Sequence, residues 1–114
     1  NYDPIDVSQY TEEEFRAAVE AAENWGTYVT VHAYTPRAIR AAIAAGVKSI
    51  EHGQMMDEDS AKLMAEKGVW LSLQPFLDNE FANPYPEGSA QRLKQLQMFA
   101  GTDNAYKLAK KYKL

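Results

Sequence analysis

Residues 29–53 read VTVHAYTPRAIRAAIAAGVKSIEHG, and this stretch decides the fold. The β-branched run at 29–33 is typical of a strand. Thr35 followed by Pro36 is typical of the first turn of a helix. A second β-prone run follows at 47–53. A strand, a helix and a strand with short links predict two parallel strands joined by a right-handed crossover.

The same alternation continues on both sides of this stretch. Three glycines that end predicted helices, Gly26, Gly46 and Gly68, are 20 and 22 residues apart. The predicted elements are a helix at 11–26, a strand at 27–33, a helix at 35–46, a strand at 47–53, a helix at 57–68, a strand at 69–75, a loop at 76–89, and helices at 89–99 and 103–114, the last capped by Thr102. This repeat is typical of an α/β barrel or of an open doubly wound sheet.

Size and composition exclude several classes of site and partner. The 114 residues suffice for one domain, and the net charge of −4 argues against a nucleic-acid partner. We expect no membrane partner, because no apolar run approaches the ~18 residues of a transmembrane helix. The chain has no cysteine, so disulfides and thiolate metal sites are excluded. Nothing in the sequence indicates a compartment.

The only two histidines occupy equivalent places in the repeat. His32 and His52 each lie six residues after a helix-ending glycine, and Gln74 takes the same place in the third unit. This place is the carboxyl end of a strand, the edge at which parallel α/β folds bind ligands. Because all three share this place in the repeat, we expect their side chains to point the same way. Neighbouring strands are about 4.8 Å apart. Two imidazoles there could reach one metal ion over bonds of about 2.0–2.1 Å.

Two histidines do not complete a catalytic site, and each could instead be a hydrogen-bonded structural residue. A catalytic zinc takes three protein ligands and a water. Glu51 directly precedes His52, so strand alternation predicts that it points to the opposite face. We therefore expect a structural role for Glu51.

The blocks V-x-V-H-A, Ala-Gly-Val and Ile-Glu-His-Gly within 29–53, followed by DEDSAKLMAEKGVWLSLQP at 57–75, resemble the amidohydrolase superfamily. The resemblance is to its imidazolonepropionase-like and prolidase-like branch. It implies an α/β fold that is part of a (β/α)₈ TIM barrel, with about three parallel strands and flanking helices. It also implies a metal-dependent hydrolase that cleaves an amide bond, in a dipeptide or a cyclic amide, with a metal-activated water.

The resemblance assigns His32 and His52 as ligands of a divalent metal, with zinc expected and a binuclear centre in the intact enzyme. The family's His-x-His pair, its bridging lysine or glutamate and its strand-eight aspartate have no match. The motif at 101–103, Gly-Thr-Asp, imitates the strand-eight motif, but no β-prone run precedes it. We therefore expect residues 1–114 to form an internal part of the barrel domain, from the loop after strand four through the helices before strand eight, and to be inactive alone.

The resemblance also implies that residues after these strand ends contact a small-molecule or peptide substrate. Tyr34 follows His32 at the mouth of the site, Arg37 could pair with a substrate carboxylate, and Gln74 could line the pocket. A surface aromatic and a solvated arginine are the alternatives for Tyr34 and Arg37.

A three-stranded piece of a barrel leaves two strand edges without partners, so we expect self-association. Two other interpretations of the sequence stay open at this point. One is a small non-catalytic α/β ligand-binding module, and the other is a structural fragment without a site.

Overall fold

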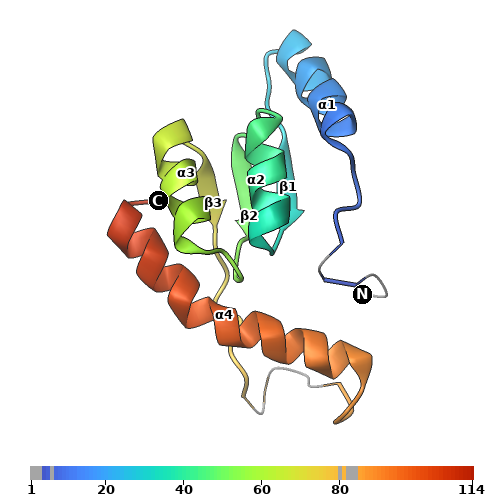
Figure 1. Cartoon of the computed structure of the whole chain (residues 1–114), viewed down its shortest axis with the longest axis vertical. Coiled ribbons are helices and arrows are strands. Elements are labelled where there is room, and N and C mark those ends of the chain that lie inside the picture. The colour runs from blue at the N-terminus through green and yellow to red at the C-terminus, as the bar shows by residue number, and fades with distance from the viewer. Residues whose placement is uncertain (1–3, 6, 80, 82–84) are drawn as a thin grey trace.

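The computed structural model describes residues 4–5, 7–79, 81 and 85–114. Some residues of the expected loop at 76–89 lie outside the described residues. The same is true of residues 1–3, with which the expected domain begins. The elements are α1 (Glu12–Asn24), β1 (Thr30–Ala33), α2 (Pro36–Ala44), β2 (Ser49–His52), α3 (Glu58–Lys67), β3 (Trp70–Ser72) and α4 (Ala90–Tyr112) (Figure 1). The predicted order is confirmed through β3, and all three strands are shorter than the β-prone runs that predicted them.

The first three helices begin at the capping residues that the sequence indicates. Thr11 and Glu14 form the reciprocal capping box of α1. The Thr35 hydroxyl accepts a hydrogen bond from the amide of Ala38, and the Asp57 carboxylate accepts one from the amide of Ser60. Each cap satisfies an amide that the first helical turn leaves without a partner, so each strand-to-helix loop ends at a fixed residue.

Helix α4 differs from the prediction because it is continuous. Thr102 is a buried residue within it, and its hydroxyl donates to the carbonyl of Phe76 at 2.7 Å. Gly101 allows the close packing there, since a Cβ at this position would lie 2.1 Å from the backbone oxygen of Gln54. The predicted break and N-cap at Thr102 are therefore wrong. The motif at 101–103 lies within a helix, and no strand of the described residues directly precedes that helix.

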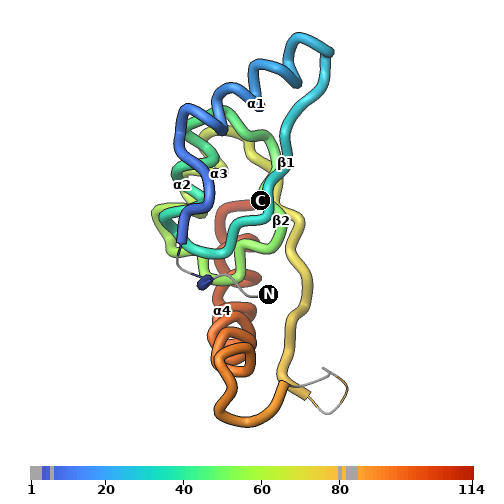
Figure 2. Tube along the Cα trace, turned by 90° about the vertical axis from the view of Figure 1, so that its right-hand side faces the viewer, coloured from blue at the N-terminus to red at the C-terminus, as the bar shows by residue number. Residues whose placement is uncertain are grey.

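The three strands form one parallel sheet in the order β1–β2–β3. Figures 1 and 2 show α1, α2 and α3 on one side of the sheet, and no helix of the described residues covers the opposite face. We call this opposite face the bare face; it carries Thr30 and His32 of β1, Ser49 and Glu51 of β2, and Trp70 and Ser72 of β3. Parallel strands with helices along one face confirm the predicted piece of a (β/α)₈ barrel.

The strand register differs from the prediction by one residue. His32 pairs with Glu51, and His52 pairs with Ala33. Gln74 lies two residues beyond the end of β3. The expectation of one shared register for the two histidines and Gln74 is wrong, because counting from the glycines assumes that every loop before a strand has the same path.

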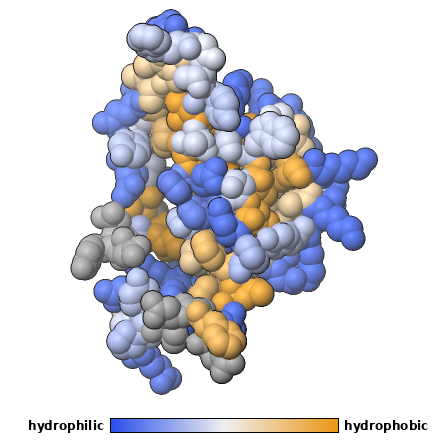
Figure 3. All heavy atoms as spheres, turned by 180° about the vertical axis from the view of Figure 1, so that it is seen from behind, coloured by the Kyte–Doolittle hydropathy of each residue, from blue (hydrophilic) through white to orange (hydrophobic). Residues whose placement is uncertain are grey.

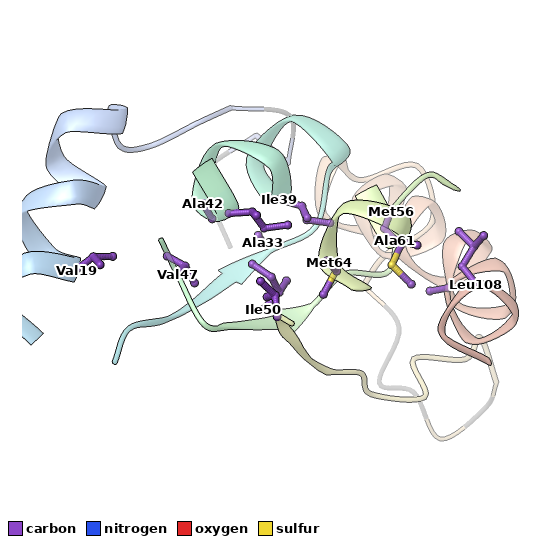
Figure 4. Close-up of a cluster of buried hydrophobic side chains, with 13 residues drawn as sticks. Val19, Ala33, Ile39, Ala42, Val47, Ile50, Met56, Ala61, Met64 and Leu108 are labelled. Carbon is purple, nitrogen blue, oxygen red and sulfur yellow. The ribbon is translucent and has the colours of Figure 1, made fainter. Parts of the chain in front are cut away.

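The core lies between the helices and the sheet (Figure 4). Ile39 of α2, Ile50 of β2 and Met64 of α3 are completely buried there. Burying a side chain of this size contributes about 1.5–3 kcal/mol. This packing fixes the helices on the sheet and so holds the carboxyl ends of β1 and β2 side by side.

Among the described residues, no helix combines the length and the apolar character that crossing a bilayer requires.

Candidate active site

The two histidines meet at the carboxyl ends of β1 and β2. Nδ1 of His32 lies 2.7 Å from Nε2 of His52, and the ring centroids are 4.8 Å apart at an interplanar angle of 29°. The prediction that both rings converge on one point is confirmed. Two neighbouring parallel strands thus bring together side chains that are 20 residues apart in the sequence.

The backbone of His52 explains how the rings meet despite the register shift. Its φ is 82°, a left-handed conformation that residues other than glycine adopt rarely. Strand alternation stops at such a residue, so the ring turns toward His32 on the bare face. The loop after His52 is tied to the loop after β1, since Gly53 donates to the carbonyl of Ala33 at 2.9 Å.

Glu51 does not point away from the histidines, and the sequence-based expectation on this point is wrong. It pairs with His32 in the register and therefore shares the bare face with it. The pKa of Glu51 is lowered, most strongly by a hydrogen bond from Ser72 and less by one from Thr30. The nearby His32 and His52 also lower it. Its carboxylate accepts from Thr30 at 3.2 Å, so the expected structural hydrogen bonding is present.

Gln74 contacts His52 directly. Its Oε1 lies 2.8 Å from Nδ1 of His52, the ring nitrogen that faces away from His32. The backbone carbonyl of Gln74 accepts from Nε2 of Gln54 at 3.1 Å. Burial lowers the pKa of His52, although the hydrogen bond to Gln74 acts in the opposite direction. His52 is therefore held as a neutral imidazole at neutral pH, the form that binds metals.

Aromatic rings surround His52. Tyr34 stacks on it with centroids 4.6 Å apart at 9°, and Phe76 lies 5.7 Å away at 27°. Burial raises the pKa of Tyr34, which keeps its phenol protonated. The sequence places Tyr34 near the site through its spacing from His32. The aromatic contact of Phe76 and the hydrogen bond of Gln54 have no periodic signal, so the sequence does not indicate that these two residues belong to the site.

Arg37 lies in the first turn of α2, with an exposed side chain. Within the described part of the chain, it makes no ion pair and no hydrogen bond to either histidine. Arg40, one turn later, pairs with Asp57 at 3.0 Å and joins α2 to the start of α3. Of the five candidate residues, the structure brings together His32, His52, Tyr34 and Gln74, and it leaves Arg37 outside this cluster.

An open cleft of about 670 Å³ lies beside the edge of β1. His32 and Tyr34 form part of its wall, and Gln91, Lys94 and Met98 of α4 form another part. The cleft therefore reaches the histidine cluster from the side that β2 does not occupy. Figure 3 shows the molecule from behind, where hydrophilic and hydrophobic side chains lie next to one another.

The donor set fits part of a metal centre. Imidazole nitrogens suit zinc and other divalent transition metals. Two nitrogens bound to one tetrahedral ion at about 2.0–2.1 Å lie about 3.3 Å apart, so the rings would need to separate by roughly half an ångström. Among the described residues, no group of three His, Asp or Glu side chains could hold a metal ion. The described residues thus offer two imidazole donors, fewer than the three protein ligands that a catalytic zinc takes.

Comparisons with known proteins match nearly the whole chain. The profile of the Amidohydrolase family matches residues 2–108. The ochratoxinase of Aspergillus niger is 39% identical over 67 residues, which are 59% of this chain and 14% of that protein. An uncharacterized protein of Mycobacterium tuberculosis is 34% identical over an alignment that covers 82% of this chain and 31% of that protein.

Solved structures agree in fold over the same region. A prolidase in complex with N-methylphosphonate-L-proline superposes with a TM-score of 0.86 at 33% identity, covering 98% of this chain and 28% of that chain. The crystal structure of the A. niger ochratoxinase gives a TM-score of 0.82 at 28% identity, covering 98% of this chain and 26% of that chain. This chain thus spans less than a third of the length of each of these proteins.

Proposed function

Because the chain belongs to the Amidohydrolase family, we propose that it forms part of a metal-dependent hydrolase that cleaves an amide bond in a small substrate. The observation that carries this proposal is the 2.7 Å approach of His32 Nδ1 and His52 Nε2 at the carboxyl ends of two parallel strands. In barrels of this kind, reactions take place at that face.

His32 and His52 are the residues of this chain that hold the metal, and zinc suits their nitrogen donors. A bound divalent ion lowers the pKa of a coordinated water toward neutrality and polarises the scissile carbonyl. His52 serves as a ligand at neutral pH because burial disfavours its protonated form. The remaining ligands, and a second metal ion, belong to other strands of the barrel. Residues 1–114 correspond to the part from the loop after strand four through the helices before strand eight.

Tyr34 and Arg37 are suited to bind the substrate. The Tyr34 ring is fixed against His52, so its phenol can donate a hydrogen bond beside the metal ligands. Arg37 is exposed in the first turn of α2, three residues after Tyr34, and can pair with a carboxylate on a substrate that spans the rim. These two groups favour a dipeptide or another amide that carries a free carboxylate. The similarity to a prolidase supports this class of substrate.

The experiment uses the complete protein that contains this chain. It is purified with zinc, its metal content is measured, and hydrolysis is assayed on dipeptides with and without a carboxyl-terminal proline and on their carboxamide analogues. We expect His32→Ala and His52→Ala each to lose metal and hydrolysis, and Arg37→Ala to raise KM for the free carboxylates more than for the carboxamides. Lys48→Ala, at an exposed position before β2, is the control. Full metal content and full hydrolysis in the two histidine variants would contradict the proposal.

A further inference from the structure

We propose that Gln74 is a positioning residue that sets the tautomer of His52. It holds the proton on Nδ1 of His52. The lone pair of Nε2 then points toward Nδ1 of His32, where the two rings would share a metal ion. The consequence for metal binding rests on the proposed function, whereas the tautomer itself is a property of the metal-free chain.

The hydrogen bond between the two side chains determines where the proton lies. The atom of Gln74 that faces His52 is Oε1, at 2.8 Å from Nδ1. An amide oxygen accepts hydrogen bonds and cannot donate them, so Nδ1 must carry the proton. A neutral imidazole with a proton on Nδ1 has its lone pair on Nε2. Nε2 is the atom that lies 2.7 Å from His32.

A second glutamine holds the first one in place. Nε2 of Gln54 donates to the backbone carbonyl of Gln74 at 3.1 Å, which ties the chain after β2 to the chain after β3. Gln54 is completely buried, and its own backbone lies against α4 at Gly101. A buried side chain between two packed segments has little freedom to move. The path of support therefore runs from α4 through Gln54 and Gln74 to His52.

Ring packing restricts the remaining motion of His52. The Tyr34 ring lies nearly parallel to it, at 9°, and Phe76 also stacks against it at 27°. These rings limit rotation about the Cβ–Cγ bond, while Gln74 selects which nitrogen faces outward. Partners of this kind orient metal-ligating histidines and typically change metal affinity 10–100-fold when removed.

The same hydrogen bonds give the two histidines different roles. With Nε2 of His52 as an acceptor, Nδ1 of His32 must be the donor in the metal-free chain. His52 is thus already in the tautomer that a metal needs, whereas His32 must move its proton from Nδ1 to Nε2 before Nδ1 can bind a metal.

The test is ¹⁵N NMR of the metal-free 114-residue chain at alkaline pH, where imidazole is neutral, with long-range correlations that distinguish protonated from unprotonated ring nitrogens. We expect His52 to show a protonated Nδ1 and an unprotonated Nε2. Gln74→Met, which has a similar length but no amide, should shift His52 toward the tautomer protonated on Nε2. Gln74→Glu keeps an acceptor oxygen and should keep the wild-type tautomer. Gln97→Met, at an exposed position of α4, is the control.

Two results would overturn the inference: His52 protonated on Nε2 in the wild-type chain, or an unchanged tautomer in Gln74→Met. The wild-type spectrum alone decides the first point, even if a variant fails to fold. In the complete protein, Gln74→Met should weaken zinc binding about 10–100-fold, and Gln74→Glu should retain it. Failure of the proposed function would appear separately, as metal content that does not depend on His32 and His52.

Discussion

Nδ1 of His32 and Nε2 of His52 lie 2.7 Å apart, although the two residues are not partners in the strand register. Regular strands would have placed Glu51, the register partner of His32, closest to it. The left-handed backbone of His52, with φ of 82°, brings the second ring to the bare face instead. The site therefore depends on one unusual backbone conformation as much as on the two imidazoles.

Because of this conformation, we expect residues 52 and 32 to rank asparagine and valine in opposite orders of stability. At residue 52, asparagine accepts a left-handed backbone and a β-branched residue does not. We expect His52→Val to be less stable than His52→Asn by about 1–2 kcal/mol. At residue 32, in a regular strand, we expect the reverse order, because valine favours strands.

Urea unfolding of the four variants measures both differences in the same chain. Because each pair compares the same two residue types, hydrophobicity alone would give the same order at both positions. The same order at residues 32 and 52 would therefore contradict the left-handed backbone at His52.

Gly101 should reverse the usual effect of alanine in a helix. In an exposed helix interior, replacing glycine with alanine stabilises by about 1 kcal/mol. In α4, the new Cβ would lie 2.1 Å from the backbone oxygen of Gln54, so the helix or the loop after β2 must move. We expect Gly101→Ala to lower the free energy of unfolding by about 1–3 kcal/mol, as overpacking does.

The control for Gly101→Ala is Gln97→Ala, at an exposed position one turn earlier in α4, where we expect little change. The Gln54 contact also links this substitution to the site. Chemical shifts of Gln74 and His52 should therefore change in Gly101→Ala and stay unchanged in Gln97→Ala. An increase in stability for Gly101→Ala would show that α4 does not pack closely against Gln54.

The sequence predicts the order of elements because its signals are local. Thr11, Thr35 and Asp57 each cap a helix through their own side chains, and the β-prone runs lie between these helices. The cluster at the strand ends is predictable for a similar reason, since parallel strands bring their carboxyl ends to one edge.

The errors arise where tertiary contacts override local signals. Thr102 has the spacing of an N-cap, but its hydroxyl instead donates to the carbonyl of Phe76, 26 residues away, and α4 continues through it. The backbone of His52 and the contacts of Gln54 also depend on segments distant in sequence. No periodic pattern contains information of that kind.

Glu58 should make the contact between α3 and α4 depend on pH. Its carboxylate accepts hydrogen bonds from Lys111, and from Tyr112 at 2.7 Å, and these bonds lower its pKa below the ordinary value of 4.5. A carboxyl with a lowered pKa in the folded chain stabilises it above the unfolded-state pKa. This contribution is lost as the pH falls through the folded-state value. We expect Glu58→Gln to be less stable than the wild type at neutral pH and equally stable in acid.

Thermal unfolding midpoints of Glu58→Gln and the wild type, measured from neutral pH into acid, give the difference in stability between them. Asp59→Asn is the control, because it also removes an acidic charge from the first turn of α3 but makes no hydrogen bond or ion pair among the described residues. Since the contact is exposed to solvent, the difference should be small and should shrink with added salt. A difference between Glu58→Gln and the wild type that stays constant with pH would contradict the prediction.

The bare face and the two edge strands should make the isolated chain associate, and we propose that β3 carries much of this tendency. Trp70, at the start of β3, is 77% exposed, and Tyr28 near the start of β1 is 64% exposed. Both lie at the same end of the sheet and line one shallow pocket together with Lys48. Unpaired strand edges beside exposed aromatic rings favour pairing with a second chain, and lysine on an edge opposes it. We expect Trp70→Lys to weaken association by at least about tenfold, corresponding to roughly 1.4 kcal/mol.

Sedimentation velocity over a wide range of concentrations measures this association. Trp25→Lys is the matched control, since Trp25 is exposed but lies in the cap of α1, outside the strands. We expect that variant to associate like the wild type. A wild-type chain that stays monomeric at all concentrations would contradict the proposal. Only Trp70→Lys changes an edge of the sheet. Equal weakening by both substitutions would therefore show that association depends on the added charge and the lost hydrophobic surface, and not on the edge of β3.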